Sequence, residues 1–277
     1  MAAVLLGVLG PKVGARLKEV TTEGVDVMLA LDVSNSMMAE DVGMERMGLA
    51  KRTVERFINQ LDGDRLGLVV FAGEAYVQCP ITTDYSAMKL FLDQVSCDMV
   101  PTQGTAIGRA IEVCSEGFDE ASPANRVVIV VTDGENHEDD AEDAARTARA
   151  SGIEVHTIGM GSVEGAPIPI IDRYGNARGF KSDGDGKPVV TALNEAMLIG
   201  IAEAGGGTFT RAGKGYVDLN PIRSAIDQLE AEEIAQVSYT DFEHRSAWFF
   251  LSAIVLLFGE AVINAGQTGN RLKTTAP

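Results

Sequence analysis

Apolar runs of strand length alternate with amphipathic stretches of helical period from Val25 onward. The run at 127–131, Val-Val-Ile-Val-Val, has no polar position, as expected for a central strand with both faces buried. Similar runs predict strands at 25–31, 66–71, 127–131, 154–159 and 208–211, with a short edge strand at 75–78.

Apolar residues three and four positions apart predict helices between these strands. The first stripe consists of Met47, Ala50, Val54, Phe57 and Leu61. Further helices are predicted at 88–95, from Thr105 onward, and at 138–150, 194–204 and 218–236. This alternation favours an α/β domain over 24–236, with a doubly wound, mostly parallel sheet and helices on both faces.

The segment 161–190 interrupts the alternation and is predicted to be an insertion, because it is rich in Gly, Pro and Asp. Its Asp183-Gly184-Asp185-Gly186 stretch resembles part of a calcium loop. No bidentate acid follows at the spacing that an EF-hand needs, so a tight turn is the better interpretation.

The two ends of the chain lie outside the domain pattern. Residues 247–263 carry Glu260 as their sole charge and are predicted to form a transmembrane helix, with a terminal helix packed on the domain as the alternative. Residues 1–10 are apolar but too short to span a bilayer, and fit a signal-peptide core or the remnant of a membrane helix. The remaining boundaries are a basic linker to residue 23, a juxtamembrane linker at 237–246 and a tail at 264–277.

The basic residues near the predicted span indicate its orientation. Arg271 and Lys273 follow the span closely, which places the tail in the cytoplasm and the domain on the extracytoplasmic side. Lys12, Arg16 and Lys18 argue for the opposite side if the N-terminal run belongs to a complete span. We give more weight to the C-terminal flank because its span is long enough to cross.

The overall charge and the cysteine and histidine positions exclude several classes of function. Forty acidic and 23 basic side chains give a net charge of -17, which repels nucleic acid. Three cysteines without CxxC spacing suggest neither a disulfide framework nor a zinc site, and Cys114 fits a buried helical stripe. The three histidines lack metal-ligand spacing.

Oxygen donors follow the first strand and the central strand of the predicted sheet. Asp32, Ser34 and Ser36 leave the first strand at alternate positions, and Asp133 ends the central one. Thr105 lies after a glycine where a helix is predicted to start. Because ligands bind at the carboxyl ends of parallel strands, these side chains are expected to converge on a hard divalent cation such as Mg²⁺.

This arrangement resembles the metal-ion-dependent adhesion site of von Willebrand factor A (VWA) domains over roughly 24–236. The resemblance implies that Ser34 and Ser36 coordinate the metal directly and that Thr105 does so directly or through water. It implies that Asp32 and Asp133 act mainly through waters. If one position of a Mg²⁺ or Mn²⁺ ion stays open, an acidic side chain of a protein partner can fill it.

Further motifs resemble the bacterial Bat aerotolerance family, whose members carry membrane helices on both sides of the VWA domain. The stretches that carry this resemblance are Met-Met-Ala-Glu-Asp-Val at 37–42, Gly-Leu-Val-Val-Phe-Ala-Gly at 67–73, Val-Gln-Cys-Pro at 77–80, Pro-Thr-Gln-Gly-Thr-Ala-Ile-Gly at 101–108 and the segment 159–167. The resemblance implies a protein of the bacterial inner membrane.

Two other functions compete with metal-dependent adhesion in the cell envelope. The chain could be a subunit of an assembly with a MoxR-type AAA+ ATPase, or bind a sister VWA protein, since VWA proteins of this type are associated with such ATPases. A Mg²⁺-dependent hydrolase is disfavoured, because Ser34 stands where an aspartyl phosphotransferase has a second carboxylate. No GxSxG elbow and no GxxxxGK[ST] loop occurs either, so no enzymatic activity is expected.

Overall fold

The computed structural model describes residues 12–15, 24–119, 121–135, 140–171, 177–229, 242–244 and 254. The chain divides into one unit of residues 22–231 and a second unit of residues 1–21 and 232–277. The functional residues predicted from the sequence all belong to the first of these.

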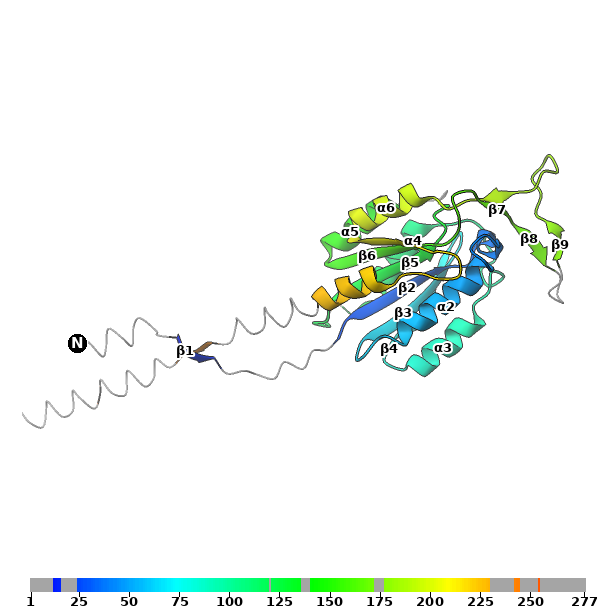
Figure 1. Cartoon of the computed structure of the whole chain (residues 1–277). Coiled ribbons are helices and arrows are strands. Elements are labelled where there is room, and N and C mark those ends of the chain that lie inside the picture. The colour runs from blue at the N-terminus through cyan, green and yellow to red at the C-terminus, as the bar shows by residue number, and fades with distance from the viewer. Residues whose placement is uncertain are drawn as a thin grey trace, which may run out of the picture. The chain divides into compact units, whose positions relative to one another are not determined.

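A six-stranded sheet forms the centre of the larger unit, with the strand order β11, β6, β5, β2, β3, β4 (Figure 1). All neighbours pair in parallel except β3 and β4, which pair antiparallel. The predicted mostly parallel α/β sheet is therefore confirmed. The strands are β2 (Asp26–Asp32), β3 (Arg65–Phe71), β4 (Ala75–Thr82), β5 (Arg126–Thr132), β6 (Ile153–Gly159) and β11 (Gly206–Arg211).

Helices cover both faces of this sheet. Along β2, Val27 and Leu29 pack into one core and Met28 and Ala30 into the other, because successive side chains of a strand point to opposite faces. One face is covered by α2 (Arg46–Ile58), α3 (Tyr85–Gln94) and the helix at 220–229, and the other by α4 (Ile107–Glu116), α5 (Ala141–Ala150) and α6 (Glu195–Ala204). Cys114 lies in the second core, as predicted, and all three cysteines are free.

Some predicted element boundaries need correction. The edge strand predicted at 75–78 is the eight-residue β4, because its pairing with β3 continues to Thr82. Thr105 does not open a helix, since α4 begins at Ile107 after Ala106 as N-cap. The helix predicted at 138–150 begins at Ala141, where the Asp140 side chain accepts a hydrogen bond from Asp143 N–H. Residues 138–139 and 230–236 of the predicted helices lie outside the described residues.

The insertion forms short antiparallel pairs rather than an irregular loop. β7 (Ala166–Pro167) pairs with β10 (Val190–Thr191), and β8 (Pro169–Ile171) pairs with β9 (Ala177–Phe180). Within it, the Asp183 carboxylate accepts hydrogen bonds from Asp185 N–H and Lys187 N–H, both at 2.9 Å. These bonds close a tight turn, which confirms the prediction for this stretch.

The smaller unit contains one short strand pair among its described residues. β1 (Lys12–Ala15) pairs antiparallel with β12 (Phe242–His244), so two segments predicted as linkers meet there. No helix of the described residues is both long and apolar enough to cross a membrane. The predicted span at 247–263 lies outside the described residues, apart from Ile254.

Candidate metal centre

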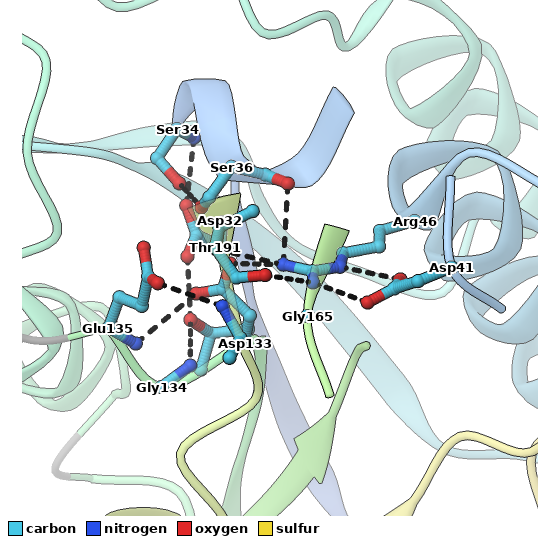
Figure 2. Close-up of polar contacts among 12 residues, drawn as sticks. Asp32, Ser34, Ser36, Asp41, Arg46, Asp133, Gly134, Glu135, Gly165 and Thr191 are labelled. Atoms are coloured by element: carbon cyan, nitrogen blue, oxygen red, sulfur yellow. Dashed lines mark hydrogen bonds and ion pairs between the residues drawn. The ribbon is translucent and has the colours of Figure 1, made fainter. Parts of the chain in front are cut away.

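Four of the five predicted metal-site residues follow two neighbouring strands at the same edge of the sheet. Asp32 is the last residue of β2, and Ser34 and Ser36 lie at the N-cap and within the 3₁₀ helix η1 (Asn35–Met38). Asp133 directly follows β5, which pairs in parallel with β2. The carboxyl ends of adjacent parallel strands thus bring these side chains together (Figure 2).

The two serine hydroxyls point to one another across the start of η1. Ser34 Oγ lies 2.9 Å from Ser36 Oγ, and both residues are buried. Two neighbouring ligands of an octahedral Mg²⁺ ion, each about 2.0–2.1 Å from the metal, lie about 2.9 Å apart. The serine pair therefore matches one edge of such an octahedron.

The Asp32 carboxylate is fully buried and bonded through both oxygens. It accepts hydrogen bonds from Ser34 N–H at 2.8 Å and from Thr132 Oγ1–H at 2.6 Å. Burial and the nearby charge of Asp133 raise the pKa of Asp32 to about 7, although the bonds from Thr132 and Ser34 act in the opposite direction. Asp32 therefore ionises less readily than an exposed aspartate, and a divalent cation at this edge of the sheet would favour its ionised form.

The loop that carries Thr105 lies against the segment 33–36 after β2, which carries both serines and is called the serine loop below. Gln103 Oε1 accepts a hydrogen bond from Asn35 N–H at 3.1 Å, and Ala106 N–H donates to Ala72 O, just beyond β3, at 2.8 Å. Thr105 stands between these two contacts and is 4% exposed. The fifth predicted residue is thus placed at the same edge of the sheet as the other four.

Asp133 is held by partners that the sequence alone did not reveal. The completely buried Arg46 donates through Nη1 to Asp133 Oδ2 at 2.8 Å. Thr191 Oγ1–H donates to the same oxygen at 3.3 Å, while Oδ1 accepts from Glu135 N–H at 3.2 Å. Gly134, with a φ of +77°, allows the turn after Asp133, where a Cβ would lie 2.9 Å from Leu198.

Arg46 also pairs with a second carboxylate. Its Nε and Nη2 donate to the two oxygens of Asp41 at 2.9 and 2.6 Å (Figure 2). Burial alone would raise the pKa of Asp41, but the hydrogen bonds from Arg46 and from Ser162 N–H hold it below its usual value. The sequence contains a signal for Arg46, because its position continues the buried face of α2 through Ala50 and Phe57.

The donor set, three hydroxyls and two carboxylates, suits Mg²⁺ or Mn²⁺, which prefer hard oxygen ligands. Within the described part of the chain, no group of three or more His, Cys, Asp or Glu side chains is arranged to hold a metal ion. The candidate site therefore depends on hydroxyl groups beside a pair of carboxylates.

Known proteins resemble this chain at the level of family and fold. The von Willebrand factor type A domain family matches residues 26–183. An aerotolerance-related membrane protein from Bacteroides fragilis is 42% identical, with a TM-score of 0.68, and the match covers 76% of this chain and 100% of that one. BatB from Bacteroides thetaiotaomicron, a conserved hypothetical protein, is also 42% identical, with a TM-score of 0.67 and coverage of 77% and 100%.

More distant proteins resemble this chain over part of its length. An uncharacterized protein of Borreliella burgdorferi is 28% identical over 74% of this chain, which spans 59% of that protein's length. Proximal thread matrix protein 1 of the mussel byssus shares the fold at 19% identity and a TM-score of 0.51, and the match covers 77% of this chain and 46% of that one. That protein was solved with zinc in its metal-ion-dependent adhesion site (MIDAS) motif. Given the family match and the Bacteroides structures, the chain belongs to the von Willebrand factor type A domain family and is similar to the Bat aerotolerance-related membrane proteins.

Proposed function

We propose that the chain binds Mg²⁺ or Mn²⁺ through Ser34, Ser36 and Thr105, with Asp32 and Asp133 in support, and uses the ion to bind a protein partner. The observation that carries this proposal is the 2.9 Å separation of the two serine hydroxyls beside two buried carboxylates. A pair of hydroxyls at this spacing provides two neighbouring positions of an octahedral site. The mussel protein of the same fold holds zinc in its MIDAS motif, which supports a divalent cation here.

The partner is proposed to offer an acidic side chain to the ion. Arg46 already pairs with Asp133, so part of that carboxylate's charge is offset within the protein. A cation that is only partly neutralised by its protein ligands favours an anionic ligand at a remaining position. VWA domains generally mediate protein–protein interaction, and the partner here is proposed to be a sister VWA protein or a MoxR-type AAA+ ATPase.

The proposed role is binding without catalysis. Asp32 is completely buried and each of its oxygens accepts a hydrogen bond, which suits a carboxylate that orients a metal site rather than an attacking nucleophile. Colorimetric phosphate release from nucleotides and phosphoesters, assayed with Mg²⁺ and with Mn²⁺, should stay at the level of the Asp32→Ala variant. Metal-dependent turnover above that level would identify a hydrolase instead.

We propose that the protein acts at the bacterial inner membrane, anchored by 247–263, with the VWA domain on the extracytoplasmic side. The description of the Bacteroides fragilis relative as a membrane protein supports membrane association. The composition of 247–263 and the basic residues after it support the anchor and its direction.

Chelator-dependent capture tests the proposed interaction. The tagged full chain, purified in detergent from native membranes in the presence of Mg²⁺, should retain a partner that EDTA elutes and that the Ser34→Ala, Ser36→Ala double variant does not capture. Mass spectrometry of the eluate distinguishes a sister VWA protein from an ATPase. A partner that stays bound in excess EDTA, or that the double variant captures equally well, would contradict a metal bridge.

A further inference from the structure

The first end of the insertion is attached to the Arg46–Asp41 pair. Ser162 N–H donates a 2.8 Å hydrogen bond to Asp41 Oδ2, the oxygen that also accepts from Arg46 Nη2. Gly161, with a φ of +126°, packs on the guanidinium so closely that a Cβ would lie 2.8 Å from its central carbon. The chain thus enters the insertion in direct contact with Arg46.

The residues that directly follow the insertion, 191–192, also lie at this guanidinium. Thr191 O accepts from Arg46 Nη2 at 3.1 Å, and the Thr191 hydroxyl contacts both Arg46 Nη1 at 3.1 Å and Asp133 Oδ2 at 3.3 Å. One residue later, Ala192 N–H donates to Glu135 Oε1 at 3.1 Å. Figure 2 shows Arg46 between Asp41 on one side and Asp133 and Thr191 on the other.

We propose that Arg46 is a positioning residue that couples the metal centre to the insertion, so that ion binding at the carboxyl edge of β2 and β5 fixes both ends of segment 161–192. This inference rests on the proposed metal site. A guanidinium suits such a role because its planar fork donates in several fixed directions at once. Here it joins Asp133, Asp41 and Thr191, which lie far apart in the sequence.

The direction of the coupling follows from charge. Asp32 and Asp133 are both buried at the same edge of the sheet and repel one another. A divalent cation offsets this repulsion and restrains Asp133, and a restrained Asp133 holds Arg46 and Thr191 in place. Because coupling between two equilibria is reciprocal, an insertion with loosened ends weakens ion binding by the same factor.

The coupling determines the surface that a partner meets beside the ion. A groove of about 580 Å³ is lined mostly by residues 45–51 at the start of α2 and by 95–98, and its lining also includes Met38 and Glu40 next to the serine loop and Pro169 and Ile171 of the insertion. On the neighbouring strand, Phe180 is 51% exposed. Metal occupancy would therefore set the position of one wall of this groove and of the apolar side chains on β8 and β9.

Hydrogen exchange of the full chain in detergent, with and without saturating Mg²⁺, tests the coupling. The reporters are peptides that contain Ser162 and Ala192, whose amides bond to Asp41 and Glu135. Mg²⁺ should slow their exchange at least tenfold, with little change in peptides from the Asp183 turn. Calorimetric binding of Mg²⁺ without this protection would overturn the inference alone, whereas absence of any Mg²⁺ binding would remove the proposed function and the inference together.

Arg46→Lys keeps the positive charge but removes the planar guanidinium that donates in several directions. The control is Arg65→Lys, which alters the Arg65–Asp26 pair at the opposite end of β2. We expect Arg46→Lys to weaken Mg²⁺ binding by roughly 10–100-fold, as for other groups that orient a metal ligand, and to abolish the protection at saturating Mg²⁺. Arg65→Lys should retain both the Mg²⁺ affinity and the protection from exchange.

Thr191→Val, which removes only the hydroxyl between Arg46 and Asp133, provides a milder variant. It should reduce the protection of these amides from exchange while Mg²⁺ still binds. Full protection in both Arg46→Lys and Thr191→Val would overturn the role of Arg46.

Discussion

Replacing Arg46 with Met would remove a buried guanidinium that neutralises two carboxylates while keeping much of the side-chain volume. Arg46 and Asp133 have fully buried side chains, and the Asp41 side chain is 6% exposed. Removing one member of a buried ion pair costs about 3–5 kcal/mol, because the partner charge stays buried without compensation. For a domain of this size, that loss corresponds to a fall in Tm of roughly 6–20 °C.

Urea unfolding of the full chain, followed by circular dichroism, measures this loss at pH 7. Arg109→Met serves as the control, because the pair of Arg109 with Glu112 lies on the exposed face of α4 and its loss should cost no more than about 1 kcal/mol. If the free energy of unfolding of Arg46→Met lies within about 1 kcal/mol of the parent's, as for loss of an exposed pair, the buried network does not stabilise the domain.

The cost of Arg46→Met should also depend on pH in a defined direction. The pKa of Asp41 is held below its usual value by Arg46 and Ser162. A carboxyl with a lowered folded-state pKa contributes stability above its unfolded pKa of about 4, and that contribution is lost as pH falls through the folded value. The difference between parent and variant should therefore shrink as the pH falls below about 4. A difference that grows on acidification would contradict the pairing.

Three further predictions concern the metal ligands, the turn after Asp133 and the membrane anchor. Mg²⁺ binding should release more protons at pH 6 than at pH 8, because burial and Asp133 raise the pKa of Asp32 to about 7 without metal. Calorimetry in two buffers of different ionisation enthalpy measures this release, and equal release at both pH values would refute the prediction. Gly134→Ala should destabilise the domain by about 1–3 kcal/mol and weaken Mg²⁺ binding, because the residue has a positive φ. Gly48→Ala, in open space on α2, should stabilise the domain by about 0.5–1 kcal/mol. If thermal unfolding showed Gly134→Ala to be the more stable of the two variants, the geometry described for Gly134 would be wrong. Protease added to intact spheroplasts should digest the domain, and carbonate should not extract the full chain; protection of the domain would reverse the orientation, and extraction would remove the anchor.

The sequence was sufficient to predict the sheet and the placement of most candidate ligands. Uninterrupted apolar runs such as 127–131 predict buried parallel strands, and alternate residues after such a strand share one edge. Asp32, Ser34 and Ser36 could be placed together because they lie at alternate positions within five residues where β2 ends. Asp133 could be added because it ends the neighbouring strand.

The electrostatic environment of the site could not be predicted in the same way. Arg46 and Asp133 are 87 positions apart, and Arg46 and Thr191 are 145 apart, so their contacts depend on how the fold brings the end of β5 and the end of the insertion to the start of α2. Local pattern carries no information about such long-range pairs. A charged residue in register with the apolar stripe of α2 was the available sign that Arg46 is buried and paired.

We propose that a divalent cation binds between the serine loop and Asp133. Crystals of the protein grown with Mn²⁺ and measured by anomalous scattering would locate this ion. We expect one strong peak within about 2.5 Å of both Ser34 Oγ and Ser36 Oγ, and its loss in a Ser34→Ala, Ser36→Ala variant that keeps the same fold. A peak elsewhere in the chain with none at this edge, or a peak that survives in the variant, would contradict it.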